Sequence, residues 1–235
     1  MEIRIATSKI RKYATRTSGD TVEIVERPNG GVSVVMADGQ SSGKGAKWVS
    51  SFVVRKVISL LADGVRDGAA ARAASDALFT ERSGRVSATL NLLSADFQTR
   101  TLVVTRNNPS PVLVAMDDEI RHLDDDCRPI GLYRGTRPLI TEYQLQVGLT
   151  VVMFTDGIVH AGKRAGEPMD AATCLRAMME DSNPTPQEIA DALVEQALRL
   201  EQGRPSDDIS VVVLRVMETG DDLVRRMSVR LPLET

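Results

Sequence analysis

The most constraining feature of this sequence is a set of strand-like runs that are apolar at every position. Val34-Val35-Met36, Val151-Val152-Met153 and Val211-Val212-Val213 show no alternation with polar residues. Successive side chains of a strand point to opposite faces of the sheet, so a strand of this kind must be covered on both faces. Two sheets packed together, with helices outside each, would cover all three runs.

Helical patterns occur at two places around a long series of predicted strands. An amphipathic helix is expected over residues 48–61 and an alanine-rich one over 67–79, with two more at roughly 169–180 and 185–201. The expected strands are 2–8, 31–37, 86–94, 101–106, 111–116, 119–123, 139–145, 149–154 and 209–217. Helix pairs around antiparallel strands indicate layers instead of a doubly wound sheet. The predicted fold is α+β: a four-layer α-β-β-α sandwich with two packed, mainly antiparallel sheets.

The chain contains no internal repeat, low-complexity tract or long linker, so one domain over residues 1–235 is expected. Residues 2–8 and 31–37 are predicted to form the first strand pair. Residues 218–235 are expected to form a C-terminal extension, with an edge-like strand at 223–233. That extension would serve as a covering strand or as a dimer contact.

Composition excludes several kinds of protein. Lys and Arg number 29 against 32 Asp and Glu, a formal charge of −3, which argues against nucleic acid or an anionic membrane as partner. The sequence lacks a targeting segment and an apolar run long enough to span a membrane, so a cytoplasmic location is expected. Two cysteines and two histidines cannot build a disulfide scaffold or a Cys- or His-rich metal site. Neither cysteine is followed by the arginine of a thiolate phosphatase loop. A metal would therefore be held mainly by oxygen.

Acidic residues occur where the predicted strands end. Asp38 and Asp156 each follow a buried strand and precede a glycine, Asp207-Asp208 opens the last apolar strand, and Asp20 follows Gly19. Carboxylates gathered at the mouth of a core repel one another and lose water, so they are costly unless a cation holds them. Mg²⁺ and Mn²⁺ prefer carboxylate and carbonyl oxygens. Two such ions about 4 Å apart are a common device for activating water against a phosphate ester.

Three other interpretations compete with a metal site. Asp-Gly is also a common hairpin turn, although a helix instead of a strand is expected after Asp38-Gly39. Residues 39–45 faintly resemble a phosphate-binding P-loop, but the pattern lacks its first glycine and its final Ser or Thr. The acidic residues at 117–119 and 124–126 are expected to be solvated hairpin surface.

The acidic motifs resemble those of the PPM, or PP2C-type, metal-dependent Ser/Thr protein phosphatases. The resemblance is strongest to the bacterial sporulation and stress-signalling branch that includes the stressosome phosphatase RsbX. It covers roughly residues 17–217, in family order, through Ser18-Gly19-Asp20, Ala37-Asp38-Gly39, Pro129-Ile130-Gly131-Leu132, Phe154-Thr155-Asp156-Gly157-Ile158 and Asp207-Asp208-Ile209-Ser210.

The resemblance implies a site for two Mn²⁺ or Mg²⁺ ions. In this interpretation Asp38 bridges the metals, the carbonyl of Gly39 holds one of them, and Asp156 and Asp207 complete the shell of the other. Asp20 acts through a water, and Asp208 has a supporting role. The resemblance also implies hydrolysis of phosphoserine or phosphothreonine on a protein by a metal-activated water, without a phosphoenzyme, so Asp38 and Asp156 are the predicted catalytic residues.

Departures from the family pattern leave the leaving-group acid open. Gln40 stands where the animal enzymes carry a histidine, so a metal-bound water or His160 would protonate the leaving group. Arg16 is a weak candidate for binding phosphate. The expected partner is a phosphorylated protein, and a STAS-type stress regulator is the guess that the resemblance suggests. The alternative function is a catalytically silent module that sequesters a signalling partner.

Overall fold

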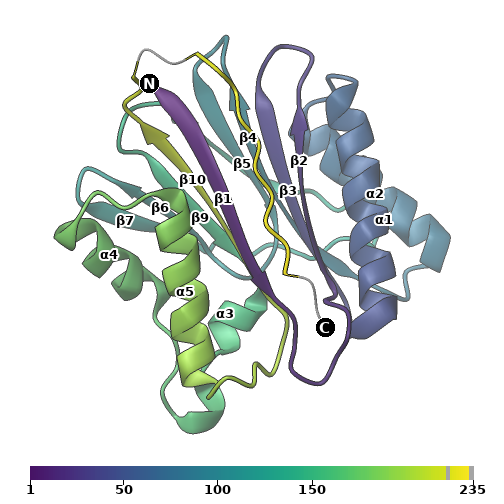
Figure 1. Cartoon of the computed structure of the whole chain (residues 1–235). Coiled ribbons are helices and arrows are strands. Elements are labelled where there is room, and N and C mark those ends of the chain that lie inside the picture. Colours follow the sequence, from purple (N-terminus) through teal and green to yellow (C-terminus); the bar gives the residue numbers. More distant parts are fainter. Residues whose placement is uncertain (221–222, 233–235) are drawn as a thin grey trace.

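The computed structural model describes residues 1–220 and 223–232, which form two five-stranded antiparallel sheets (Figure 1). One sheet has the order β1 (Glu2–Ile10), β10 (Ile209–Met217), β9 (Thr150–Phe154), β6 (Val112–Met116) and β7 (Glu119–Leu123). The other has the order β2 (Asp20–Glu26), β3 (Val32–Gly39), β4 (Ala88–Asp96), β5 (Thr101–Asn107) and β8 (Leu139–Gln144). We call them the β1 sheet and the β2 sheet.

Helices cover the outer face of each sheet. Helices α1 (Gly43–Ala62) and α2 (Asp67–Arg82) pack on the β2 sheet, and α4 (Ala171–Asp181) and α5 (Pro186–Leu200) pack on the β1 sheet. The predicted four-layer α-β-β-α sandwich is therefore confirmed. Thr185 caps α5 with Glu188 in a capping box, and Pro186 occupies its first turn, as expected for a helix start.

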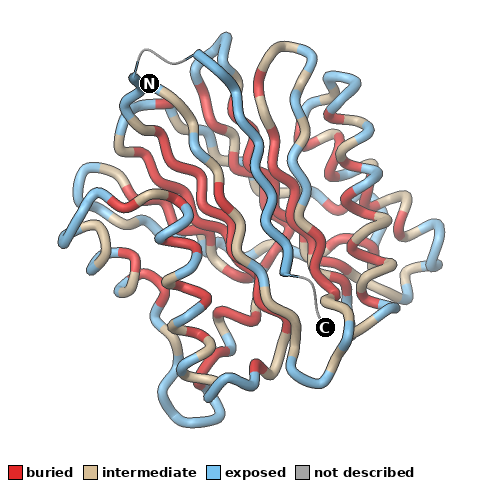
Figure 2. The backbone as a smooth tube through the Cα atoms, in the orientation of Figure 1, coloured by how far each residue is buried: buried red, intermediate tan, exposed pale blue. Residues whose placement is uncertain are grey.

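The strands that are apolar at every position lie between two cores. Along β3, Val34 and Met36 face the core between the sheets, whereas Val35 and Ala37 face α1 and α2. Strand β10 repeats the arrangement, with Val212 facing the inner core and Val213 facing α5. Figure 2 shows buried residues, in red, along the central strands of both sheets. Because both faces are dry, neither strand tolerates polar alternation.

The predicted first strand pair is wrong. Strand β1 pairs with β10, and β3 pairs with β2, a strand that the sequence analysis missed, so β1 and β3 belong to different sheets. Strand β2 is rich in β-branched residues, Thr21, Val22, Ile24 and Val25, and this composition is the signal that could have revealed it. The short helices α3 (Asp156–His160) and η1 (Lys163–Ala165) were also missed, because segments of this length carry no helical period.

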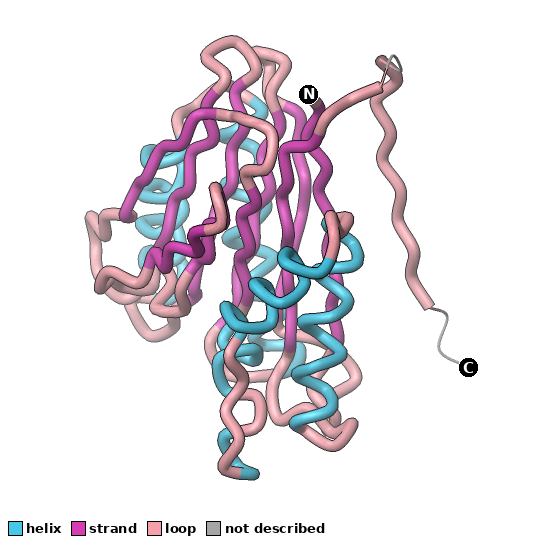
Figure 3. The backbone as a smooth tube through the Cα atoms, turned by 90° about the vertical axis from the view of Figure 1, so that its left-hand side faces the viewer, coloured by secondary structure: helices cyan, strands magenta, loops and turns pink. Residues whose placement is uncertain are grey.

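The C-terminal extension does not form the expected strand where the structure describes it. Residues 223–232 make no strand pairing, and Figure 3 shows them standing apart from the two sheets; residue 233 lies outside the described residues. Arg225 contacts Glu26 of β2 at 3.7 Å, but Leu223 and Val229 remain over 80% exposed. A single domain over residues 1–235 stays a prediction. Within the described ranges, none of the helices is long and apolar enough to cross a membrane.

Candidate metal centre

The predicted acidic residues lie at the ends of strands from both sheets. In the β2 sheet, Asp20 opens β2 and pairs directly with Asp38 near the end of β3. In the β1 sheet, Asp156 follows β9, and Asp207 lies just before β10, which pairs with β9 through Val211 and Phe154. The antiparallel pairing brings these strand ends to one end of the sandwich.

Asp38 is the most perturbed carboxyl of this cluster. Burial is the main cause that raises its pKa, from an ordinary 3.8 to about 9. The carboxylates of Asp20, Asp156 and Asp207 raise the pKa further by repulsion. All three carboxylates therefore lie within electrostatic range of Asp38, and ionising Asp38 beside them is unfavourable without a cation.

Asp156, His160 and Asp207 form a group with the spacing of metal ligands. One ligand atom from each lies within 4.8 Å of the other two, close enough to share one ion. The Nδ1 of His160 is 3.7 Å from Oδ2 of Asp156. Burial and then the charge of Asp207 raise the pKa of Asp156, while His160 opposes the shift. Asp38 does not belong to this 4.8 Å group, and its relation to it is electrostatic.

Asp20 is fully buried, and among the described residues only one of its two carboxylate oxygens has a hydrogen-bond partner. Its Oδ2 accepts hydrogen bonds from the hydroxyls of Ser210 at 2.6 Å and Thr155 at 3.1 Å, both from the opposite sheet. Its Oδ1 is also buried but has no hydrogen-bond partner among the described residues. Burial raises the pKa of Asp20 to about 6. A buried oxygen without a partner is costly, so this oxygen is suited to contact a cation or a water bound to one.

Asp208 has a different environment from its neighbour Asp207. Its Oδ1 accepts the backbone N–H of Lys12 at 2.8 Å, and its Oδ2 accepts that of Gly19 at 2.7 Å. Both oxygens thus hold the segment that leads into Asp20. This geometry agrees with a supporting role, which stays a prediction.

Gly39 and Gly157 allow the close approaches that assemble the site. A Cβ on Gly39 would lie 2.1 Å from the carbonyl oxygen of Ala46, and one on Gly157 would lie 2.1 Å from that of Asp208. Both strands lead into helices, β3 into α1 and β9 into α3. The hairpin-turn interpretation of these Asp-Gly pairs is therefore wrong. The rival acidic residues at 117–119 and 124–126 are exposed, as expected.

Two lysines that the sequence analysis missed lie behind the carboxylates. Lys9 of β1 and Lys47 of α1 both donate from Nζ to the backbone carbonyl of Asp20, at 2.5 and 2.8 Å. Burial is the first cause that lowers the pKa of both lysines. Nothing in the sequence around either residue marks it. Thr155 and Ser210, by contrast, stand inside the quoted motifs.

The donor set fits a hard divalent cation. It consists of carboxylates at a partly dry edge, and one of them carries an unpartnered buried oxygen. Sulfur ligands are absent from the group, and the one imidazole is half exposed. The arrangement therefore matches an oxygen-ligated Mg²⁺ or Mn²⁺ site better than a zinc site.

Comparison with known proteins decides the family. The family model of stage II sporulation protein E (SpoIIE) matches residues 28–217. The chain belongs to the SpoIIE family. The stage II sporulation protein E of Bacillus subtilis (strain 168) is 26% identical over 199 residues, which make up 85% of this chain and 24% of that protein. The chain therefore spans about a quarter of the length of that curated relative.

Solved structures share the fold. The PP2C phosphatase domain of SpoIIE from Bacillus subtilis, with a fragment of its regulatory domain, has a TM-score of 0.80 at 22% identity, covering 93% of this chain and 64% of that one. RsbX in complex with magnesium has a TM-score of 0.69 at 13% identity, covering 91% and 95%. The fold of this SpoIIE-family chain is that of the PPM phosphatases, as the sequence resemblance implied.

Proposed function

We propose that this chain is a metal-dependent protein phosphatase that hydrolyses phosphoserine and phosphothreonine. The observation that carries the proposal is the convergence of Asp20, Asp38, Asp156 and Asp207 from two sheets onto one edge. Membership of the SpoIIE family and a fold shared with PP2C phosphatases support it. The physiological substrate is proposed to be a bacterial stress- or sporulation-signalling protein, of which a STAS-type regulator is one candidate.

The proposed ligands of two Mn²⁺ or Mg²⁺ ions are Asp38, the carbonyl of Gly39, Asp156 and Asp207. Such ions supply a water activated for attack on phosphorus and neutralise the charge that develops on the phosphate. Asp20 is proposed to act through its unpartnered Oδ1 on a water in the same site. Thr155 and Ser210 fix the orientation of Asp20 by holding its other oxygen.

Gln40 is not a proton donor in this proposal. The side-chain amide of Gln40 is not acidic at neutral pH, and its Oε1 accepts a hydrogen bond from the backbone N–H of Ser87 at 2.9 Å. His160 is the titratable side chain adjacent to Asp156. It remains the alternative to water as the acid for the leaving group.

The direct test is turnover of p-nitrophenyl phosphate with Mn²⁺. We expect activity that EDTA abolishes and that Asp38→Ala and Asp156→Ala each remove while circular dichroism stays native. Asp124→Ala, which removes an exposed carboxylate from the acidic surface, is the matched control and should retain activity. Activity near wild type in either site variant would overturn the proposal. A folded, Mn²⁺-loaded wild type without any turnover would favour the silent binding module instead.

A further inference from the structure

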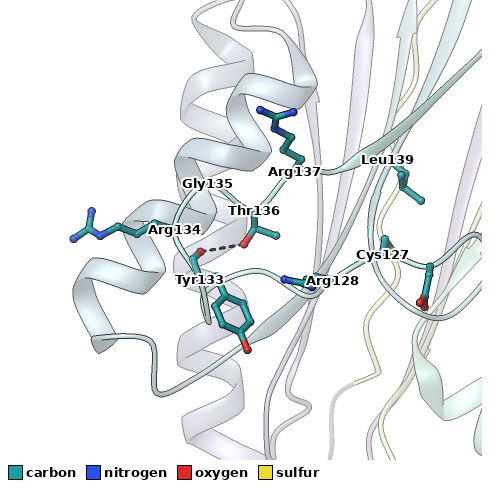
Figure 4. A pocket seen from close by; sticks show the side chains of 9 residues that line it. Cys127, Arg128, Tyr133, Arg134, Gly135, Thr136, Arg137 and Leu139 are labelled. Atoms are coloured by element: carbon teal, nitrogen blue, oxygen red, sulfur yellow. Dashed lines mark hydrogen bonds between the residues drawn. The ribbon is translucent and has the colours of Figure 1, made fainter.

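A pocket of about 350 Å³ lies in the loop of residues 124–138, which joins β7 to β8 (Figure 4). Arg128, Arg134 and Arg137 line it together with the exposed ring of Tyr133. Asp126 is the one acidic residue of the lining, so the charged side chains around the pocket are mainly positive. None of the residues that line the pocket belongs to the carboxylate cluster.

The pocket loop crosses between the sheets at the end that carries the carboxylates. It leaves β7 after Leu123, which pairs with Val112 of β6, and enters β8 at Leu139, which pairs with Arg106 of β5. In its middle, Ile130 exchanges backbone hydrogen bonds of 2.9 and 3.1 Å with Ala88. Ala88 is in turn the β-partner of Gly39, next to Asp38. The neighbouring strands of a sheet lie about 4.8 Å apart, so β5 is roughly 10 Å from β3.

Side-chain amides anchor the pocket loop to this end. The Nδ2 of Asn107 donates to the carbonyls of Arg128 at 3.0 Å and Arg137 at 3.3 Å, which fixes both ends of the arginine-bearing segment. The Nδ2 of Asn108 donates to the carbonyl of Phe154, two residues before Asp156. Asn107 therefore holds both sides of the arginine-bearing segment, and Asn108 connects the end of β5 to β9, the strand that precedes Asp156.

The three arginine side chains that line the pocket are exposed. Within residues 1–220 and 223–232, no carboxylate forms an ion pair with Arg128, Arg134 or Arg137. Arg134 lies over the ring of Phe79 at 4.9 Å, and Arg128 lies 5.6 Å from the ring of Tyr133. Stacking restrains an arginine without using its forked donors, which remain available to a carboxylate or a phosphate.

We propose that this pocket binds acidic side chains of the phosphoprotein substrate, close to the phosphorylated residue in its sequence. The inference rests on the proposed phosphatase function and deepens it, because it assigns part of the substrate preference to Arg128 and Arg137. A substrate whose phosphate reaches the carboxylate edge would lay its neighbouring residues across the adjacent pocket loop. Exposed arginines there attract glutamate and aspartate and not neutral side chains.

The test compares two synthetic phosphoserine peptides, one with glutamates flanking the phosphoserine and one with glutamines in their place. For the wild type, we expect kcat/KM for the glutamate peptide to be about tenfold higher, which corresponds to about 1.4 kcal/mol shared between two exposed charge pairs. Arg128→Glu/Arg137→Glu should reduce this preference to about one or reverse it. Arg176→Glu/Arg199→Glu, which makes the same charge change on exposed positions of α4 and α5, should keep it. High salt should weaken the wild-type preference.

A binding measurement separates failure of this inference from failure of the proposed function. Fluorescence anisotropy of each labelled peptide with EDTA-treated protein needs no turnover. Tighter binding of the glutamate peptide, lost in Arg128→Glu/Arg137→Glu and kept in the control, supports the pocket even if p-nitrophenyl phosphate is never hydrolysed. Equal kcat/KM and equal affinity for the two peptides, or a preference that the pocket variant retains, would overturn it.

Discussion

At the scale of single residues, the candidate site is defined by carboxyl groups that the fold makes costly. Asp20 is fully buried with one oxygen unpartnered, and the pKa of Asp38 is raised to about 9, first by burial and then by its acidic neighbours. A cation bound between these groups would relieve both costs, which is the physical reason to expect one.

Replacing Asp38 by Asn should stabilise the metal-free protein. Between pH 3.8 and about 9 the folded state holds a proton on Asp38 that the unfolded state releases, so this carboxyl lowers the free energy of unfolding as pH rises through that window. Asp38→Asn removes the effect, so in EDTA at pH 8 the free energy of unfolding of the variant should exceed that of the wild type by more than about 1.4 kcal/mol, the equivalent of one pKa unit.

Urea denaturation in EDTA across this pH range measures the difference. The gap should be small near pH 4 and grow toward pH 9, and added Mn²⁺ should reverse the order by stabilising the wild type alone. A gap that does not change with pH would contradict the account of Asp38.

The acidic residues could be found from the sequence, whereas their supports could not. Asp38 and Asp156 each end an apolar run and precede a glycine, so their positions at strand ends could be predicted. Lys9 and Lys47 reach the carbonyl of Asp20 from β1 and α1. Their contacts depend on how distant elements pack, which no local pattern encodes.

At the scale of elements, close backbone contacts fix the distances between the strand ends. The start of α3 packs directly on the residues that open β10, because Gly157 presents no Cβ to the carbonyl of Asp208. The sequence predicted a strand end at Phe154, but not that a five-residue helix would begin at Asp156. A helix this short is decided by its packing and not by its propensity.

Gly157→Ala should therefore disrupt the site without touching a carboxylate. The new Cβ would lie 2.1 Å from the Asp208 carbonyl, so α3 must move away from β10 and separate Asp156 from Asp207. We expect a stability loss of about 1–3 kcal/mol and Mn²⁺ binding weakened at least about tenfold by isothermal titration calorimetry. The control is Gly45→Ala in α1, where a Cβ meets nothing within 4 Å. Native Mn²⁺ affinity in Gly157→Ala would refute this role of the glycine.

At the scale of the whole molecule, the sandwich makes a site that neither sheet contains alone. Strands of the β2 sheet contribute Asp20 and Asp38, and segments that adjoin β9 and β10 of the β1 sheet contribute Asp156 and Asp207. The layered fold could be predicted from the sequence, because strands that are apolar at every position must be buried on both faces. The pairing of β1 with β10 could not be predicted, because the two strands lie far apart in the sequence and no local pattern encodes their contact.

The measurement that tests the central claim most directly is anomalous X-ray scattering at the manganese edge, from crystals grown with Mn²⁺. The account predicts manganese peaks at the shared edge of the sheets, contacted by carboxylates of both sheets: Asp38 from one, and Asp156 or Asp207 from the other. Manganese bound only at the exposed acidic residues 124–126, or a carboxylate edge without any peak at saturating Mn²⁺, would contradict it.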